Sequence, residues 1–190
     1  MNTSDYVLDF WFGARDAPDF GTSRDWWFRK SDATDAAIRE RFGADVEASL
    51  RGERDDWAAS PRGALALILV LDQFTRNMFR DTPRAFAGDA SALHLAKSLV
   101  DSGRNLKLAP IERWFATMPF EHSEQLIDQY EGLRLFEALV PLGLPDALKW
   151  AQLHCDVIRQ FGRYPHRNAI LGRTSTPQEL EFLKQPGSSF

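Results

Sequence analysis

The chain has 190 residues, of which 44% are hydrophobic and 12% aromatic, a composition that excludes a disordered protein and suffices for one large core. A net charge of −4 without a Lys/Arg-rich tract argues against nucleic-acid binding, and the single cysteine, Cys155, excludes an intrachain disulfide and a cysteine-based zinc site. The longest apolar run, residues 64–71, is too short to span a bilayer and residues 1–13 do not read as a signal peptide, so we predict one cytoplasmic domain over residues 1–190 with no nucleic-acid or membrane partner.

Helix signals dominate from the first aromatic segment onward. Ser31 is placed as an N-cap, Ser60 and Pro61 give an N-cap with proline at the first helical position, and Thr176 opens a capping box with Glu179. In chain order, residues 6–12 form an aromatic segment that leads into a loop, and the sequence then predicts helices over residues 32–50, 61–80, 89–102, 111–117, 123–140 and 145–161, and a short one after Thr176. No segment requires a strand, so we predict an all-α fold of about seven to nine helices.

The helix predicted from residue 61 ends in the first of three polar segments, LDQFTRNMFR. At about 100° per residue, Asp72, Arg76 and Arg80 share one stripe, with Gln73 and Asn77 beside it. The first turns are apolar all round, so the helix is predicted to start in the core and to carry polar groups to the rim of a cavity. Two interpretations stay open: a solvated i,i+4 ion pair, or a partly buried arginine that faces a ligand or another segment.

The second polar segment is MPFEHSE. Pro119 is predicted to precede a helix that starts near residues 121–123, where acidic residues in the first turn interact favourably with the helix dipole. Glu121, His122 and Glu124 could instead do acid–base work or serve as partners for arginines. The spacing matches neither H-E-x-x-H nor a pair of E-x-x-H motifs, so we predict no metal site.

The third polar segment is FGRYPHRN, which is predicted to be a loop because a glycine ends the preceding helix and a proline prevents its continuation. Its Arg163, His166, Arg167 and Asn168 could bind a carboxylate or phosphate through charge-assisted hydrogen bonds. Alternatively, these donors satisfy helix carbonyls and the acids Glu121, Glu124 and Asp72 of the other two segments. Arg173, just beyond, fits either role.

The remaining polar residues suggest less chemistry. His154 shares a helical face with apolar residues and is predicted to be a satisfied core residue, while Cys155 is predicted to be an inert buried thiol. The chain has no nucleophile elbow and no glycine-rich phosphate loop, so we predict no cofactor.

Six stretches follow one another in order over nearly the whole chain: FWFG, LDQFTRNMFR, AFAGDASAL, MPFEHSE, FGRYPHRNAILGR and STPQELEFL. On these residues the chain resembles the bacterial family called domain of unknown function 924. The resemblance implies a tetratricopeptide-like stack of antiparallel helical hairpins. It implies no reaction, substrate or catalytic residue.

Three functional hypotheses remain. The first is a binding or interaction module for a peptide or protein, built around a buried Arg/His/Glu network, and the second is a small-molecule enzyme or sensor with an anion-binding pocket. The third is a purely architectural role in which the arginines pair with the acids. The candidate catalytic residues are His122, Glu121 and His166, the candidate ligand-binding residues are Arg76, Asn77, Arg163, Arg167 and Asn168, and the candidate network residues are Asp72, Gln73, Glu124 and Arg173.

Overall fold

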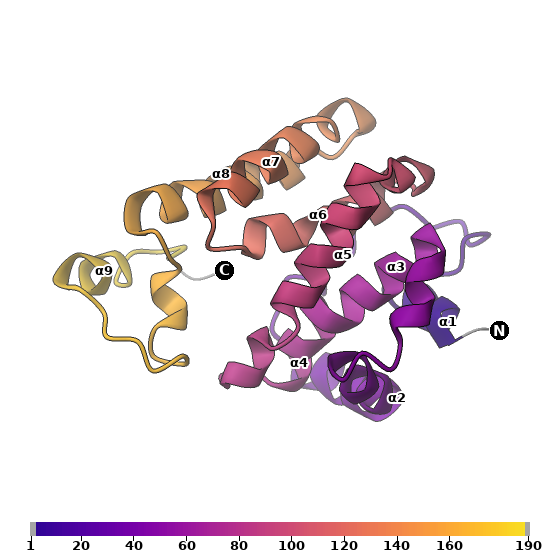
Figure 1. The fold of residues 1–190 in the computed structure, drawn as a ribbon, viewed down its shortest axis with the longest axis horizontal. Helices are drawn as coiled ribbons and strands as arrows, with labels where there is room; N and C mark the ends of the chain where they lie inside the picture. The colour runs from indigo at the N-terminus through magenta and orange to yellow at the C-terminus, as the bar shows by residue number, and fades with distance from the viewer. Residues whose placement is uncertain (1–2, 189–190) are drawn as a thin grey trace.

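The computed structural model describes residues 3–188, and within them every regular element is a helix (Figure 1). The all-α prediction is therefore confirmed. The α-helices are α1 (Thr3–Phe12), α2 (Asp32–Leu50), α3 (Pro61–Ile68), α4 (Thr75–Met78), α5 (Asp89–Asp101), α6 (Pro110–His122), α7 (Leu126–Glu137), α8 (Pro145–Phe161) and α9 (Pro177–Phe182). Short 3-10 turns are η1 (Asp55–Ala59), η3 (Pro83–Phe86), η4 (Arg104–Lys107), η5 (Val140–Leu142) and η6 (Pro165–Arg167), and η2 (Leu69–Phe74) is π-helical.

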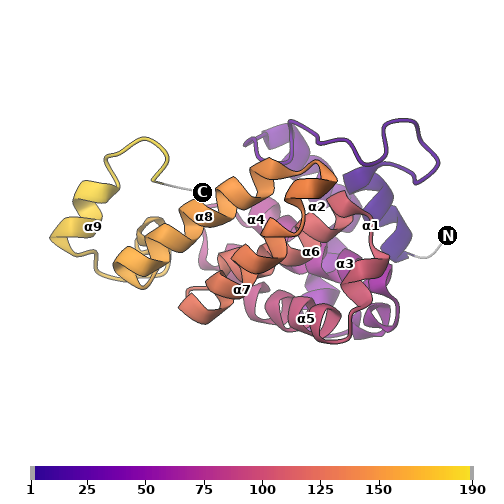
Figure 2. The same cartoon turned by 90° about the horizontal axis from the view of Figure 1, so that it is seen from above.

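Helix α3 forms the centre of the larger part of the molecule, because α1, α5 and α6 all pack against it. On the other side of α6, helices α7 and α8 lie side by side and are joined by a short turn (Figures 1 and 2). Helix α9 lies at the opposite end of the molecule from α1. The pair α7 and α8 is a helical hairpin, but the tetratricopeptide-like repeat stays a prediction. In the described part of the chain, no helix has both the length and the apolar character that crossing a bilayer requires.

The polypeptide between α1 and α2 is held by an aromatic cluster. Trp27 packs edge-to-face on Phe115 of α6 with ring centroids 4.7 Å apart, and its indole N–H donates to the Trp11 carbonyl at 3.0 Å. Trp11 and Phe12 of α1 also pack edge-to-face on Phe115. Such pairs stabilise beyond the area they bury. The cluster therefore fixes the segment that follows Trp27 against α6.

The predicted helix from residue 61 exists, but its winding changes along its length. Ser60 Oγ accepts from the Gly63 N–H at 3.0 Å with Pro61 at the first position, as the sequence predicts. After Ile68 the helix widens into η2 and returns to α-helix at Thr75. From Gly63 to Thr75 every residue is buried, and after the π turn polar groups reach the surface again. Sequence periodicity did not reveal this π segment, a feature that is frequent at functional sites.

The prediction for Pro119 is wrong, because Pro119 lies inside α6, which continues to His122. Glu121 and His122 are thus in the last turn of a helix, not the first. The amide of Gln129 explains why the helix ends there, since it donates to the carbonyls of Glu121 at 2.8 Å and Ser123 at 2.6 Å. Carbonyls at the end of a helix have no partner within that helix, and Gln129 supplies a donor to these two. A tertiary cap thus sets this helix boundary.

Candidate functional site

The three polar segments meet at the C-terminal end of α6. His122 Nδ1 lies 2.7 Å from Asp72 Oδ1, which joins the first segment to the second. Arg167 donates to the His122 carbonyl at 3.2 Å, and the Tyr164 hydroxyl donates to the Glu121 carbonyl, which joins the third segment to the second. Residues about 40 to 50 positions apart in sequence are therefore brought into one cluster.

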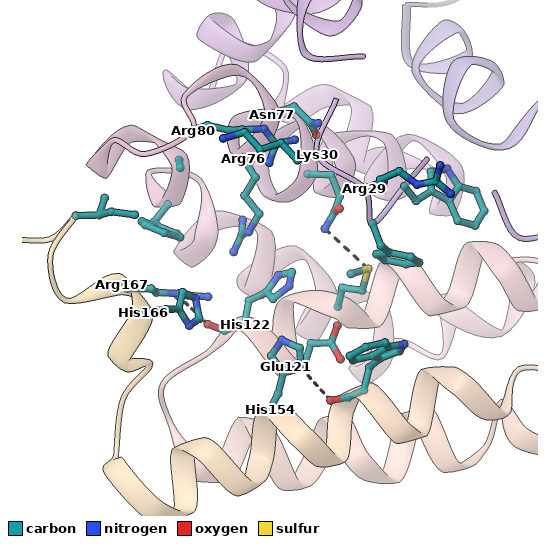
Figure 3. A pocket seen from close by; sticks show the side chains of 18 of the residues that line it. Arg29, Lys30, Arg76, Asn77, Arg80, Glu121, His122, His154, His166 and Arg167 are labelled. Carbon is teal, nitrogen blue, oxygen red and sulfur yellow. Dashed lines mark hydrogen bonds between the residues drawn. The ribbon is translucent and has the colours of Figure 1, made fainter. Parts of the chain in front are cut away.

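A cavity of about 610 Å³ opens beside this cluster (Figure 3). Its walls come from α4, α6, α8, the aromatic segment before α2 and the loop that contains η6. The volume falls in the range of small-molecule sites. The polar residues that line it are Arg29, Lys30, Gln73, Arg76, Asn77, Arg80, Asp81, Glu121, His122, His154, His166 and Arg167, and the aromatic ones are Trp27, Phe28, Phe86, Trp114 and Trp150.

Arg76 is held at the cavity wall by two carboxylates that lie behind it. It binds Asp89 with two hydrogen bonds of 2.9 and 3.1 Å, and lies 3.2 Å from Asp72. Burial disfavours the charged form of Arg76, but the negative charges of Asp72 and Asp89 outweigh this effect and raise the pKa of Arg76 above its usual value. A Cβ at residue 88 would lie only 2.2 Å from the Leu71 carbonyl oxygen, so only glycine at this position lets α5 begin against η2. This close approach brings Asp89, the next residue, to Arg76.

Arg167 lies beside Arg76 and is buried, with 8% of its side chain exposed. Its guanidinium stacks between the rings of Phe86 and Tyr164, at 4.7 and 4.5 Å from their centroids. Its hydrogen bond to the Asp89 carboxylate is long, at 3.4 Å, and the same carboxylate also binds Arg76. Its Nε finds no hydrogen-bond partner among residues 3–188. Burial and the neighbouring Arg76 lower the pKa of Arg167, so its charge is only partly compensated.

Beside these arginines the cavity wall carries Glu121 and three imidazoles that are uncharged at neutral pH. Burial and the nearby Asp72 raise the pKa of Glu121 well above its usual value. Burial lowers the pKa of His154 to about 3 and that of His166 to about 4. Burial also lowers the pKa of His122, although Asp72 partly offsets this. Neutral imidazoles can accept hydrogen bonds and ligate metals, and one ligand atom from each of Glu121, His122 and His154 lies within 4.8 Å of the other two.

Several candidate residues belong instead to a second cluster, which we call the loop network: Arg163, Arg173, Glu124, Glu179 and Asn168. Arg163 binds Glu179 with hydrogen bonds of 2.6 and 2.8 Å, and Asn168 donates to the same carboxylate at 3.2 Å. Arg173 binds Glu124 at 2.7 and 3.0 Å, and that carboxylate also accepts the Tyr164 N–H. None of the five lines the cavity.

We call the other cluster the pocket network: Arg76, Arg167, Asp72, Asp89 and Glu121. The expectation that arginines pair with Glu121 is wrong, since its carboxylate binds no arginine within the described residues and its Oε2 has no hydrogen-bond partner there. Arg163 pairs with Glu179 in its place. The residues predicted from sequence that do line the cavity are Gln73, Arg76, Asn77, Glu121, His122, His166 and Arg167.

Sequence reasoning missed His154, Asp89 and the aromatic walls. His154 is buried as predicted, but it also faces the cavity. Its signal was hidden because it lies on α8, in none of the three polar segments. Asp89 had a weak signal, since it follows a glycine at a helix start, where an acid is explained by the helix dipole alone. Trp150 is 44% exposed, an unusual position for tryptophan that only the structure reveals.

Comparison with known proteins gives a family and a fold but no activity. The family profile described as bacterial protein of unknown function (DUF924) matches residues 7–187. A solved structure of a protein of unknown function from Agrobacterium tumefaciens is 35% identical in sequence, covers 95% of this chain and 96% of its own, and superposes with a TM-score of 0.83. A search of curated proteins found no match to the chain.

Proposed function

We propose that this protein, which belongs to the DUF924 family of bacterial proteins of unknown function, binds a small organic anion in the cavity beside α6. The observation that carries the proposal is the buried Arg167. Its carboxylate partner is Asp89, and Asp89 also pairs with Arg76. A buried charge with incomplete compensation is costly unless a partner supplies the rest. An anionic ligand would be that partner.

The distribution of charge around the cavity supports an anion over a cation. Five cationic residues line it, against two acidic ones, Asp81 and Glu121. The raised pKa of Glu121 disfavours one of these two negative charges. The carboxylates of Asp72 and Asp89 lie behind the arginines and do not line the cavity. They orient the guanidinium groups and leave the cationic side toward a ligand.

The apolar walls indicate that the ligand has more than a charged group. Trp114 of α6 and Trp150 of α8 line the cavity together with Phe28 and Phe86. A cavity of about 610 Å³ is far larger than inorganic phosphate needs. We therefore propose a carboxylate or phosphate ester whose apolar part packs on the tryptophans. This favours the small-molecule pocket over the peptide or protein interaction module.

Thermal shift with matched ligands tests the proposal. The panel is phenyl phosphate and benzoate, with inorganic phosphate as the anion without a ring and benzamide as the ring without a charge. A ligand at about 100 times its Kd stabilises a folded protein by about 2.7 kcal/mol, which corresponds to roughly 5–10 °C in Tm at this size. We expect the aromatic anions to raise Tm most, inorganic phosphate less and benzamide not at all.

Two variants locate the effect. Arg167→Ala should abolish the shift by all anions, whereas Arg134→Ala, which removes an exposed arginine from α7, should leave it unchanged. If Arg167→Ala does not fold, Trp150→Ala serves instead and should weaken binding of the aromatic anions more than of inorganic phosphate. The proposal is wrong if no anion shifts the wild-type Tm, or if the Arg167→Ala protein responds like the Arg134→Ala protein.

A further inference from the structure

We propose that Glu121, His122 and His154 form a binding site for one divalent transition-metal ion on the part of the cavity wall that α6 and α8 supply. Glu121 and His122 come from the last turn of α6, and His154 faces them from α8. One ligand atom from each lies within 4.8 Å of the other two. Figure 3 shows the three side chains next to one another at one end of the cavity.

The two histidines are oriented in the way that metal-binding histidines are. His122 Nδ1 donates to the Asp72 carboxylate at 2.7 Å, and His154 Nδ1 donates to the Trp150 carbonyl at 2.9 Å. In a neutral imidazole these bonds put the proton on Nδ1 and the lone pair on Nε2. Metal-ligating histidines almost always make such a bond from the other ring nitrogen, because it fixes the tautomer and the ring orientation. Both outer bonds are present here.

Glu121 supplies a second, independent observation. The residue is 3% exposed and lines the cavity, yet its Oε2 has no hydrogen-bond partner in residues 3–188. Its main chain is fixed, since Gln129 and the Tyr164 hydroxyl both donate to its carbonyl. A buried carboxyl oxygen without a partner is rare in a folded protein and needs an explanation. A cation bound between Glu121 and the two imidazoles supplies the missing contact.

The donor set selects the kind of ion. Two imidazole nitrogens with one carboxylate oxygen suit Zn²⁺ or Fe²⁺, whereas Mg²⁺ and Ca²⁺ prefer oxygen ligands alone. Ligand atoms about 2.1 Å from a tetrahedral ion lie roughly 3.4 Å apart, so a pair within 4.8 Å would close by at most about 1.4 Å on binding. Three protein ligands leave a further coordination position, which faces the cavity. The sequence-based expectation of no metal site considered only local spacing, and His122 and His154 are far apart along the chain.

This inference goes beyond anion binding and does not depend on it, because none of the three ligands is an arginine. The test is therefore made without carboxylate or phosphate. Protein treated with chelator and then freed of it is titrated with Zn²⁺ in a chloride buffer by calorimetry. We expect one Zn²⁺ per chain, no comparable heat with Mg²⁺, and visible absorption bands on adding Co²⁺ that indicate nitrogen and oxygen coordination.

Three variants decide whether the site is the one proposed. His154→Ala and Glu121→Gln should each weaken Zn²⁺ binding at least 10-fold, while His94→Ala, which removes an exposed histidine from α5, should bind as the wild type does. Glu121→Gln keeps the side-chain shape, so it remains informative if His154→Ala fails to fold. The inference is overturned if the wild type binds no Zn²⁺, or if these variants bind it as tightly as His94→Ala does. Either result leaves the anion test unaffected.

Discussion

The loop network and the pocket network use the same residue types but differ in how their glutamates are paired. In the loop network each carboxylate has several donors, with Glu179 accepting from Arg163, Asn168 and the Thr176 N–H. In the pocket network Glu121 has no donor to Oε2, and Arg167 shares one carboxylate with its neighbour. The comparison teaches that composition does not separate an architectural cluster from a functional one. The pairing of the glutamates does, since arginines bind both Glu124 and Glu179 of the loop network, whereas no described arginine binds Glu121 of the pocket network.

The pKa values of Glu179 in the loop network and Glu121 in the pocket network shift in opposite directions. Hydrogen bonds from Arg163 lower the pKa of Glu179 to about 2, so the charged form is the stable one in the folded protein. Burial and Asp72 raise the pKa of Glu121, so its charged form is disfavoured. Glu179 therefore stabilises the fold when ionised, whereas the ionised form of Glu121 lowers the stability of the fold.

The largest effect is expected from removing the central carboxylate of the loop network. Glu179→Ala strands the Arg163 guanidinium, the Asn168 amide and the Thr176 N–H at once. We expect a loss of about 3 kcal/mol in the free energy of unfolding, measured by urea denaturation. Glu181→Ala, on the same helix but in an exposed pair with Lys184, is the control and should change it by less than about 0.5 kcal/mol. Equal effects of the two substitutions would remove the architectural role of the loop network.

A smaller effect of opposite sign is expected in the pocket network. Glu121→Gln replaces a buried carboxyl whose charged form has no donor to Oε2 by a neutral amide of the same shape. In metal-free protein kept in chelator, we expect the free energy of unfolding at neutral pH to rise by about 1 kcal/mol. A clear loss of stability would show that Glu121 already has its partners inside the protein, and the division between the two networks would fail.

The sequence predicted the features that depend on neighbouring residues, and it did not predict those that depend on residues far apart along the chain. The N-caps Ser31, Ser60 and Thr176 were predicted from neighbouring residues and are confirmed, because a cap needs only its own first turn. The end of α6 was predicted wrongly, because Gln129 from another helix determines it. The all-helical fold follows from many such local signals, whereas the π turn of η2 gave none.

The candidate site was predicted only as a list of residue types. The sequence indicated that charged groups from distant segments would need partners, and the structure brings these segments together at His122. It could not indicate which acid takes which arginine, because Glu121, Glu124 and Glu179 are chemically alike. Only their placement decides that Arg163 reaches Glu179. A cavity, likewise, is defined by side chains far apart in sequence.

The last prediction is a pH dependence of the free energy of unfolding that isolates Glu179. Its folded-state pKa of about 2 lies below the usual value of about 4.5, so its stabilising contribution is complete above about pH 4.5 and is lost as the pH falls toward 2. Glu179→Gln lacks this titration but keeps the side-chain shape. The difference in free energy of unfolding between wild type and Glu179→Gln should therefore be constant from about pH 7 to about pH 5 and should narrow below that.

Other acids with lowered pKa values, among them Asp35 and Glu124, titrate in both proteins, so they cancel in this difference. Urea denaturation of the two proteins in parallel at a series of pH values gives the difference directly. Narrowing below about pH 4.5 assigns the stabilisation to the ionised carboxylate. A gap that stays constant into acid would mean that Glu179 acts through its hydrogen-bonded shape alone, and its charge would then not distinguish the loop network from the pocket network.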